Sequence, residues 1–570
     1  MNAIMTHSFR PQSSWLVALL LASLLILTGC DSNDSGMNDQ SPQASVSTST
    51  DQFTVSFDAS GTTDPDGGSI RSYNWDFGDG DTETGAQVEH TYAQSGDYNV
   101  SLEVVDDEGQ SADSSFTLTV DPDRIVVTDD ITENATWSSD KTYVLDGLVF
   151  VDPGVTLTIE SGTVVKARPQ GDISNEDGAS ALIVRRDGTV NADGSSDNPI
   201  IFTSTQDDLQ DDSDLGPTDR ALWGGVILLG NAPISEPQSV QIEGIPDSEN
   251  ALFGGDDPQD NSGTLRYVSI RHGGFSISGV SGDEINGLTM GGVGSGTTIE
   301  YVEVFANLDD GFEWFGGTVH AKNLVAAYCG DDSFDWDTGF RGTGQFWFAV
   351  QGTDAAGRGG ELDGFDLTTD ENADEFSDAV VSNATFIGSG ASASPEGGND
   401  YALRIRNGGA GEWYNSIFTA YPDLGVRIDA DDGSDDRWSA GDITLRTNVF
   451  FDYGAGSDLP SIVADGNGET NPNGNTRDQQ IDADNAFQDP QLGGIDRGRN
   501  GVLDPRPNAN LPDSESKSSF ENTSESGSDG YPGVDLSPIQ DVGYVGAFDP
   551  SGSLWTNGWT KLSTEGYTTN

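Results

Sequence analysis

The chain has 570 residues and a net charge of −70, from 95 Asp and Glu against 25 Lys and Arg. A surface this acidic repels nucleic acids and anionic membrane surfaces, which excludes both as binding partners. The 73 glycines and 34% hydrophobic residues are typical of a turn-rich β protein rather than a helical one. Two explanations of the acidity stay open: adaptation of the whole surface to high salt, or calcium held at particular places.

The N-terminus carries Arg10 and then an apolar run, residues 15–27. This run is too short to span a bilayer and has the length of the hydrophobic part of a secretory signal. It ends in Leu27-Thr28-Gly29-Cys30, which resembles the bacterial lipobox. That resemblance implies a lipoprotein signal peptide over 1–29 and acylation of Cys30, with a plain secretory signal as the alternative.

Residues 30–43 are polar and unpatterned, which is typical of a flexible tether. We therefore expect a membrane-anchored lipoprotein of the cell envelope that faces outside the cytoplasm. Its contact with the membrane is the Cys30 lipid alone. The outer membrane or cell surface is favoured, and Asp31 leaves the inner membrane open.

Residues 44–121 alternate apolar and polar side chains in short segments separated by turns rich in Gly, Asp and Pro. This pattern predicts a small β-sandwich with Trp75 and Phe77 in its core. Four motifs in order resemble a PKD domain, an immunoglobulin-like module: FDASGTTDPDG at 57–67, YNWDFGDG at 73–80, HTYAQSGDYNVSLEV at 90–104 and DDEG at 106–109. The resemblance implies a spacer or adhesion module without catalysis.

Residues 309–330 and 331–352 are two consecutive repeats of equal length. Each opens Asp-Asp-x-Phe-acid-Trp and closes on an apolar stretch. A period near 22 is too short for a repeated helix pair and fits one turn of a parallel β-solenoid. We therefore predict an all-β chain in which the β-sandwich is followed by a large parallel β-helix over 122–570. Its loop-rich part, about 455–570, is expected to end in a C-terminal cap.

This region resembles the right-handed parallel β-helix superfamily with the pectin-lyase-like fold. More closely, it resembles an uncharacterised group of bacterial envelope β-helix proteins. The shared passages are NGLTMGGVGSGTTIEYVEV at 286–304, DDGFEWFGGTVHAKNLVA at 309–326, GDDSFDWDTGFRG at 330–342 and YVGAFDP at 544–550. The resemblance implies a right-handed solenoid and brings no established activity.

Stacking the two repeats in register places acids of one coil over acids of the next, about 4.8 Å apart. Two unit charges at that distance repel by roughly 3 kcal/mol at an effective dielectric near 20. One hypothesis is calcium held among these carboxylates and turn carbonyls. The other is a solvated acidic turn whose first aspartate caps loop amides. The candidate metal ligands are Asp309, Asp310, Glu313, Asp331, Asp332 and Asp335.

Trp314 and Trp336 occupy the same place in the two repeats. They are expected either as stacked core residues of the solenoid or, if exposed, as a ligand-binding platform for a sugar.

Two short motifs suggest catalysis. Gly330-Asp331-Asp332 resembles part of the polygalacturonase signature, and Arg404-Ile405-Arg406 resembles its basic motif. If the protein is an enzyme, the candidate catalytic residues are Asp331, Asp332, Arg404 and Arg406. The chain departs from that family because no Gly-His-Gly lies between the motifs, no histidine follows His320, and the basic motif has no Lys.

Three functions stay open. The favoured one is a lipid-anchored, non-enzymatic protein that binds a polysaccharide or a cell-envelope partner with the help of calcium. The second is a polysaccharide lyase or glycoside hydrolase on the β-helix scaffold. The third is a purely structural envelope protein.

Overall fold

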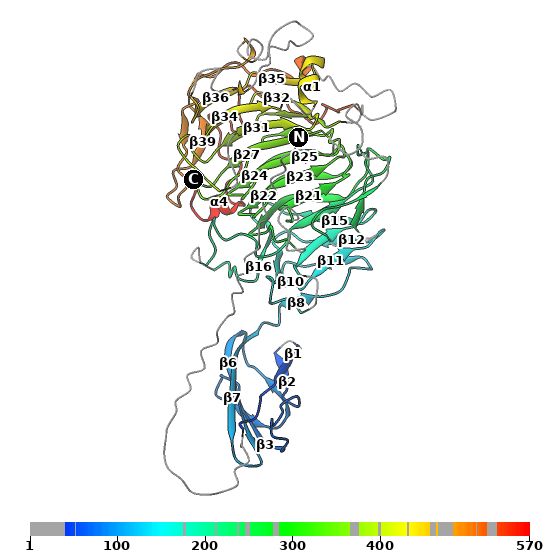
Figure 1. Ribbon diagram of the computed structural model, residues 1–570, viewed down its shortest axis with the longest axis vertical. Helices are drawn as coiled ribbons and strands as arrows, with labels where there is room; N and C mark the ends of the chain where they lie inside the picture. The colour runs from blue at the N-terminus through cyan, green and yellow to red at the C-terminus, as the bar shows by residue number, and fades with distance from the viewer. Residues whose placement is uncertain are drawn as a thin grey trace, which may run out of the picture. The chain divides into compact units, whose positions relative to one another are not determined.

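In the computed structural model the chain divides into two compact units, Met1–Pro122 and Asp123–Asn570, and the regular secondary structure described in them is almost all strand (Figure 1). No helix among the described residues is long and apolar enough to cross a membrane. The signal peptide, Cys30 and most of the tether predicted from the sequence lie outside the described residues. The structure describes residues 40–569 apart from 52, 175–177, 211–213, 236–238, 246–250, 277–283, 365–375, 397–400, 430–432, 457–462, 465–480, 482, 509 and 521–532.

The first unit is the predicted β-sandwich. One antiparallel sheet has the order β1 (Ser47–Asp51), β2 (Thr54–Asp58), β5 (Gln87–Thr91). The other has the order β4 (Thr82–Thr84), β3 (Ile70–Asp76), β6 (Gly96–Asp106), β7 (Ser111–Val120). Trp75 and Phe77 are each 1% exposed in the core between the sheets, as the alternation predicted.

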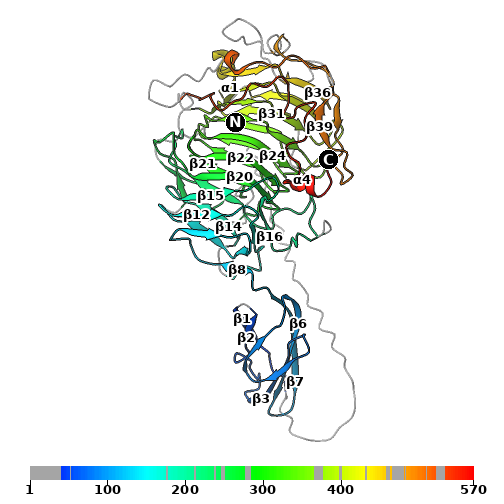
Figure 2. The same cartoon turned by 180° about the vertical axis from the view of Figure 1, so that it is seen from behind.

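The second unit is a parallel β-helix, in which short strands of successive coils pair in parallel (Figures 1 and 2). One face is a ten-stranded sheet: β11 (Leu148–Val151), β14 (Ala181–Val184), β17 (Val226–Leu229), β21 (Leu288–Gly291), β23 (Phe312–Phe315), β25 (Phe334–Asp337), β28 (Gly360–Asp363), β31 (Tyr401–Arg406), β34 (Leu424–Ile428) and β37 (Val463–Ala464).

An eighteen-stranded sheet builds the rest of each coil. Its strands are β8 (Arg124–Val127), β9 (Ala135–Trp137), β10 (Thr142–Leu145), β12 (Thr156–Ile159), β13 (Val164–Ala167), β15 (Thr189–Asp193), β16 (Ile200–Ser204), β20 (Gly263–Arg271), β22 (Thr298–Phe305), β24 (His320–Ala327), β26 (Thr343–Gln345), β27 (Phe348–Val350), β29 (Asp378–Ser382), β30 (Thr385–Ile387), β32 (Ala410–Tyr414), β33 (Ile417–Tyr421), β35 (Ile443–Arg446) and β36 (Val449–Tyr453).

A few short elements complete this unit. They are the antiparallel pairs β18 (Val240–Gln241) with β19 (Leu252–Phe253) and β38 (Leu492–Gly494) with β39 (Asp504–Pro507), the helices α1 (Ser434–Ala440) and α4 (Lys561–Thr564), and the 3-10 turn η2 (Lys517–Ser519).

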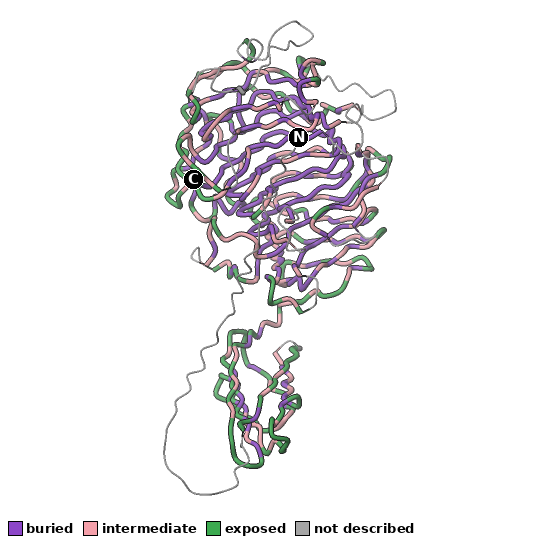
Figure 3. The backbone as a smooth tube through the Cα atoms, viewed as in Figure 1, coloured by how far each residue is buried: buried purple, intermediate pink, exposed green. Residues whose placement is uncertain are grey.

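The two sequence repeats are vertical neighbours, as their spacing predicted. Strand β23 pairs with β25 so that Trp314 lies opposite Trp336 and Glu313 opposite Asp335. Figure 3 shows the coils buried along most of their length. The interval of 22 residues does not hold for every pair of neighbouring strands. Leu362 of β28 lies opposite Ile405 of β31, and these two residues are 43 positions apart. Loops between the strands absorb the difference.

Left-handed backbone bends the chain at one corner of the larger sheet, inside β22 and β24 and between the strands of the pairs β26–β27, β29–β30 and β32–β33. Tyr301 (φ 54°), Asn323 (φ 56°) and Phe346 (φ 58°) take this conformation in successive coils. Asn383 and Asn415 take it farther along the stack. Asparagine tolerates positive φ better than most residues, which explains why it recurs here.

The C-terminal segment lies along the flank of the coils, which corrects the expected end cap. Phe548, Trp559 and Leu562 pack on residues of β22, β24 and β27 in one buried apolar cluster. The figures show α4 beside the middle of the stack (Figures 1 and 2). Apolar side chains on the outside of these coils need a cover, and the C-terminal segment supplies it there.

Candidate functional site

One register position of the ten-stranded sheet carries a charged side chain in five successive strands, β23, β25, β28, β31 and β34. Because side chains alternate across a strand, the flanking residues of this position point into the solenoid. The five residues in strand order are Glu313, Asp335, Glu361, Arg404 and Arg427.

The turns that precede these strands add a second line of carboxylates. The backbone N–H of Asp332 donates to Asp310 Oδ1 at 2.8 Å, and the backbone N–H of Arg358 donates to Asp332 Oδ1. These turn aspartates therefore cap the turn of the next coil. The alternative expected from the sequence was a solvated turn capped by the first aspartate of each pair, but the second aspartate caps it and is buried. Asp310 is 7% exposed and Asp332 2% exposed.

Together these residues form a continuous carboxylate row: Asp309, Asp310, Glu313, Asp331, Asp332, Asp335 and Glu361. Three groups in it each bring carboxylate oxygens within 4.8 Å of one another. Asp310 belongs to the first two groups, and Asp335 belongs to the last two. The groups are Asp309 with Asp310 and Asp331, Asp310 with Glu313 and Asp335, and Asp332 with Asp335 and Glu361. All six carboxylates predicted as ligands are thus brought together.

Burial makes ionisation of this row costly. Burial, and next the charge of Asp331, raises the pKa of Asp309 to about 8. Burial also raises the pKa of Asp363, which lies two residues after Glu361 on β28, to about 6, although Arg406 opposes the shift. Burial raises the pKa well above its ordinary value, with neighbouring carboxylates adding to the effect, at Asp310, Glu313, Asp332 and Asp335. At neutral pH the row therefore takes up protons or a compensating cation.

The two arginines predicted from the basic motif lie at the β28 side of the row. Arg404 donates to Glu361 at 3.3 Å and to Asp429 at 2.8 Å. Arg406 donates to Asp363 at 2.7 Å and forms an ion pair with Glu361 at 2.9 Å. Both guanidinium groups are thus held between two carboxylates of the protein.

Comparison with known families matches both units. A family model described as a pectate-lyase-like β-helix domain covers residues 129–489, and a PKD domain model covers residues 39–120. The chain belongs to the pectate-lyase-like β-helix family.

Individual relatives of this β-helix protein match shorter parts of it. A microbial collagenase of Vibrio alginolyticus is 42% identical over 66 residues, and collagenase ColQ1 of Bacillus cereus (strain Q1) is 46% identical over 66 residues. Each match covers 12% of this chain, but the chain spans only 8% and 7% of those proteins.

Among solved structures, the PKD1 domain of Vibrio anguillarum Epp is 34% identical over 15% of this chain and 98% of that one, with a TM-score of 0.14. The family 28 exopolygalacturonase of Yersinia enterocolitica is 11% identical over 73% of this chain and 85% of that one, with a TM-score of 0.15.

The β-helix buries both tryptophans that were considered for ligand binding. Trp314 and Trp336 are 0% exposed. Trp314 stacks on Trp347 at 5.0 Å, and Trp336 stacks on Trp413 at 5.8 Å. The ligand-platform hypothesis is therefore wrong, because their alternation with outward acids turns the rings into the solenoid. They are core residues.

Sequence reasoning missed three residues at the β28 side of the site. Glu361 and Asp363 alternate with apolar Leu362 just as Asp335 alternates with Trp336, so this pattern contained a usable signal. Arg358 had no such signal. A loop brings it next to Asp331 and Asp332, 26 residues after the latter.

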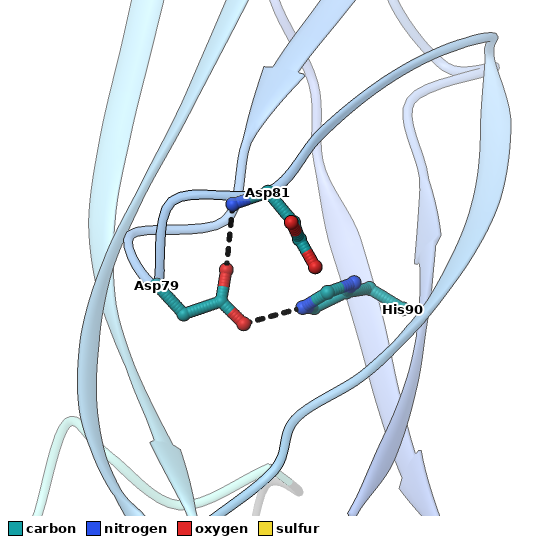
Figure 4. A group of neighbouring side chains, drawn as sticks. All are labelled: Asp79, Asp81 and His90. Atoms are coloured by element: carbon teal, nitrogen blue, oxygen red, sulfur yellow. Dashed lines mark hydrogen bonds and ion pairs between the residues drawn. The ribbon is translucent and has the colours of Figure 1, made fainter.

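The PKD domain holds two further groups of possible ligands. Asp79 Oδ2 lies 2.7 Å from His90 Nε2, and Asp79 Oδ1 accepts the Asp81 N–H at 3.1 Å. Figure 4 shows both contacts. The His90 ring stacks on Phe77 at 4.2 Å, so this group is explained as a packed ion pair. The second group is Asp64, Asp66 and Glu108.

Proposed function

We propose that this protein binds an anionic polysaccharide at the cell envelope, without catalysis, through calcium held by the carboxylate row. The PKD domain and the pectate-lyase-like β-helix fit an extracellular role related to carbohydrate. Lipid anchoring through Cys30 places the β-helix outside the cytoplasm in this proposal. The calcium bridges the protein's carboxylates and the acidic groups of the polysaccharide.

The observation that carries the proposal is the uneven distribution of charge along the row. Among the described residues, salt bridges reach Asp331, Asp332 and Glu361, all at the β25–β28 side. In the described part of the chain, none within 4.0 Å reaches the carboxylates of the β23 coil, which are Asp309, Asp310 and Glu313. Asp335 of β25, which shares a group with two of them, has no salt bridge there either.

The donor set fits calcium. Calcium prefers hard oxygen ligands at about 2.4 Å, so two ligands of one ion lie at most about 4.8 Å apart. The three groups of the row meet this limit with oxygen atoms alone. Asp331 Oδ1 and Asp335 Oδ1 are shielded from solvent and have no hydrogen-bond partner. Such acceptors are costly unless a cation or proton compensates them.

The arginines favour binding over catalysis. A lyase needs a basic side chain free to act on the substrate, but Arg404 and Arg406 are each engaged by two carboxylates. Burial lowers the pKa of Arg406, but the contacts with Asp363 outweigh burial, so this pKa lies above its ordinary value. This side chain is therefore a poor proton acceptor.

The test is calorimetric titration of the purified chain with calcium. We expect Asp310→Asn and Glu313→Gln to weaken calcium binding to the β-helix by at least about tenfold, because each removes a charged ligand. Glu83→Gln, an exposed change in the PKD domain, is the matched control. Any calcium that the Asp64, Asp66 and Glu108 group binds is the same in the unmodified chain and the three variants, so it is subtracted.

A second measurement concerns the polysaccharide. Binding to immobilised polyuronates and sulfated glycans is expected in calcium and lost in chelator, and Asp310→Asn is expected to lose it. Binding that is equal with and without calcium contradicts the proposal. An unsaturated or reducing-end product released from a polyuronate by the purified chain supports the lyase or hydrolase alternative instead.

A further inference from the structure

Arg358 replaces a carboxylate in the third coil of the row. Gly311 N–H donates to the Asp332 carbonyl and Ser333 N–H to the Arg358 carbonyl, so Asp310, Asp332 and Arg358 occupy equivalent places in successive turns. Side-chain hydrogen bonds link the same three residues in the same order. Asp310 accepts the backbone N–H of Asp332, and Asp332 accepts the backbone N–H of Arg358. A positive charge thus stands where the first two coils have a negative one.

The Arg358 guanidinium lies near Asp332 and Glu361 of the third group and Asp331 of the first, without binding any of them closely. It is 3.7 Å from Asp332 Oδ2, 3.5 Å from Glu361 Oε1 and 3.9 Å from Asp331 Oδ1. Its Nε is shielded from solvent and makes no hydrogen bond. The side chain is 18% exposed, so most of its surface is covered by the protein.

The backbone next to Arg358 makes room for this arrangement. A Cβ added to Gly357 would collide with Asp331 Oδ1 and Asp332 Oδ1. Glycine at this place lets both carboxylates approach the turn that carries the guanidinium. The charge is therefore positioned by packing of the turn, while its ion pairs stay longer than normal hydrogen bonds.

We propose that Arg358 is a resident cation that fills the third carboxylate group and so limits calcium to the other two groups. This role of Arg358 rests on the proposed calcium site, and it would set the number of calcium ions that the carboxylate row binds. A divalent cation and the guanidinium compete for Asp332 and Glu361, because both satisfy the same oxygens. A calcium ion in the third group therefore requires Arg358 to leave it.

The experiment is calcium titration of the full-length chain and three variants, Arg358→Ala, Arg358→Gln and Arg427→Ala. We expect Arg358→Ala and Arg358→Gln each to bind one more calcium ion per chain than the unmodified protein. Arg427→Ala removes a guanidinium from the same face, where it pairs with Asp429, and is expected to leave the number unchanged. Melting curves in chelator and in calcium accompany each titration, and calcium is expected to raise the melting temperature of the Arg358 variants most.

Equal calcium numbers in the unmodified chain and both Arg358 variants overturn this inference and leave the proposed calcium site standing. An extra ion in Arg427→Ala also overturns it, because general loss of positive charge would then explain the effect. Absence of β-helix calcium in every protein overturns both proposals. Should Arg358→Ala fail to fold, Arg358→Gln decides between these outcomes, since it keeps the bulk of the side chain.

Discussion

At the scale of single residues, the carboxylate row shows how burial converts ordinary acids into proton-binding groups. Asp309 is the clearest case, with a pKa of about 8 that arises from burial first and from Asp331 second. A carboxyl whose pKa is higher in the folded state than in the unfolded state binds protons more tightly when folded. Its contribution to stability is present at low pH and is lost as the pH rises through the folded value.

A pH dependence follows for the calcium-free protein. We expect its melting temperature to fall as the pH rises from about 5 to about 9, because Asp363 and then Asp309 must ionise in the folded protein. Differential scanning fluorimetry in chelator measures the slope, and added calcium is expected to flatten it. Asp309→Asn is the control and should remove the upper part of the fall. A melting temperature that rises steadily over this range contradicts the expectation.

At the scale of elements, a buried carboxylate attaches the C-terminal segment to the coils. Glu303 of β22 is 0% exposed and accepts the backbone N–H groups of Lys561 (2.7 Å) and Leu562 (3.2 Å) at the start of α4. Ser269 of β20 donates to the same carboxylate at 2.5 Å. One side chain therefore satisfies amides that a short helix leaves without intrahelical partners.

Glu303→Gln tests this attachment. The amide replaces a charged acceptor by a neutral one, so we expect the free energy of unfolding to fall by about 1.5–3 kcal/mol. We also expect faster proteolysis of the C-terminal segment. Glu300→Gln is the matched control on the same strand, because Glu300 is 37% exposed and pairs with Arg266 at 3.2 Å. That pair is worth at most about 1 kcal/mol. Equal effects of the two substitutions would contradict a special role for Glu303.

At the scale of the whole molecule, the net charge of −70 dominates. Acids are spread over both units, and the carboxylate row holds only a small part of them. Repulsion among exposed carboxylates opposes compaction and is screened by salt, whose Debye length falls from about 10 Å at 0.1 M to about 3 Å at 1 M. Salt adaptation and local calcium binding are thus compatible, and they act on different residues.

Salt dependence separates the two effects. In chelator we expect the melting temperature to rise by several degrees between about 0.1 M and about 1 M NaCl. KCl should give the same rise, since screening depends on ionic strength. A difference between sodium and potassium would point to a specific cation site, and a melting temperature that is independent of both salts would remove screening as the reason for the acidity.

Much of the fold could be predicted because repeats and alternation are local properties of the chain. The two 22-residue repeats predicted that Trp314 and Trp336 are vertical neighbours and that their acids gather, and pairing of β23 with β25 confirms this register. The alternation in residues 44–121 predicted the sandwich and its Trp75 core. In the two 22-residue repeats, acids alternate with the tryptophans. Acids that point outward imply tryptophans that point inward, so the repeats already argued against a ligand platform.

Local patterns in the chain were thus enough to predict the two domains, the stacked coils and the six clustered carboxylates, because residues near in the chain decide strand, turn and register. Which charges compensate these carboxylates and what covers the coils became clear only from the folded molecule. Arg358 reaches Asp332 through a loop, and Lys561 reaches Glu303 from 258 residues away. Such contacts depend on how the coils close in space, and no short-range pattern encodes them.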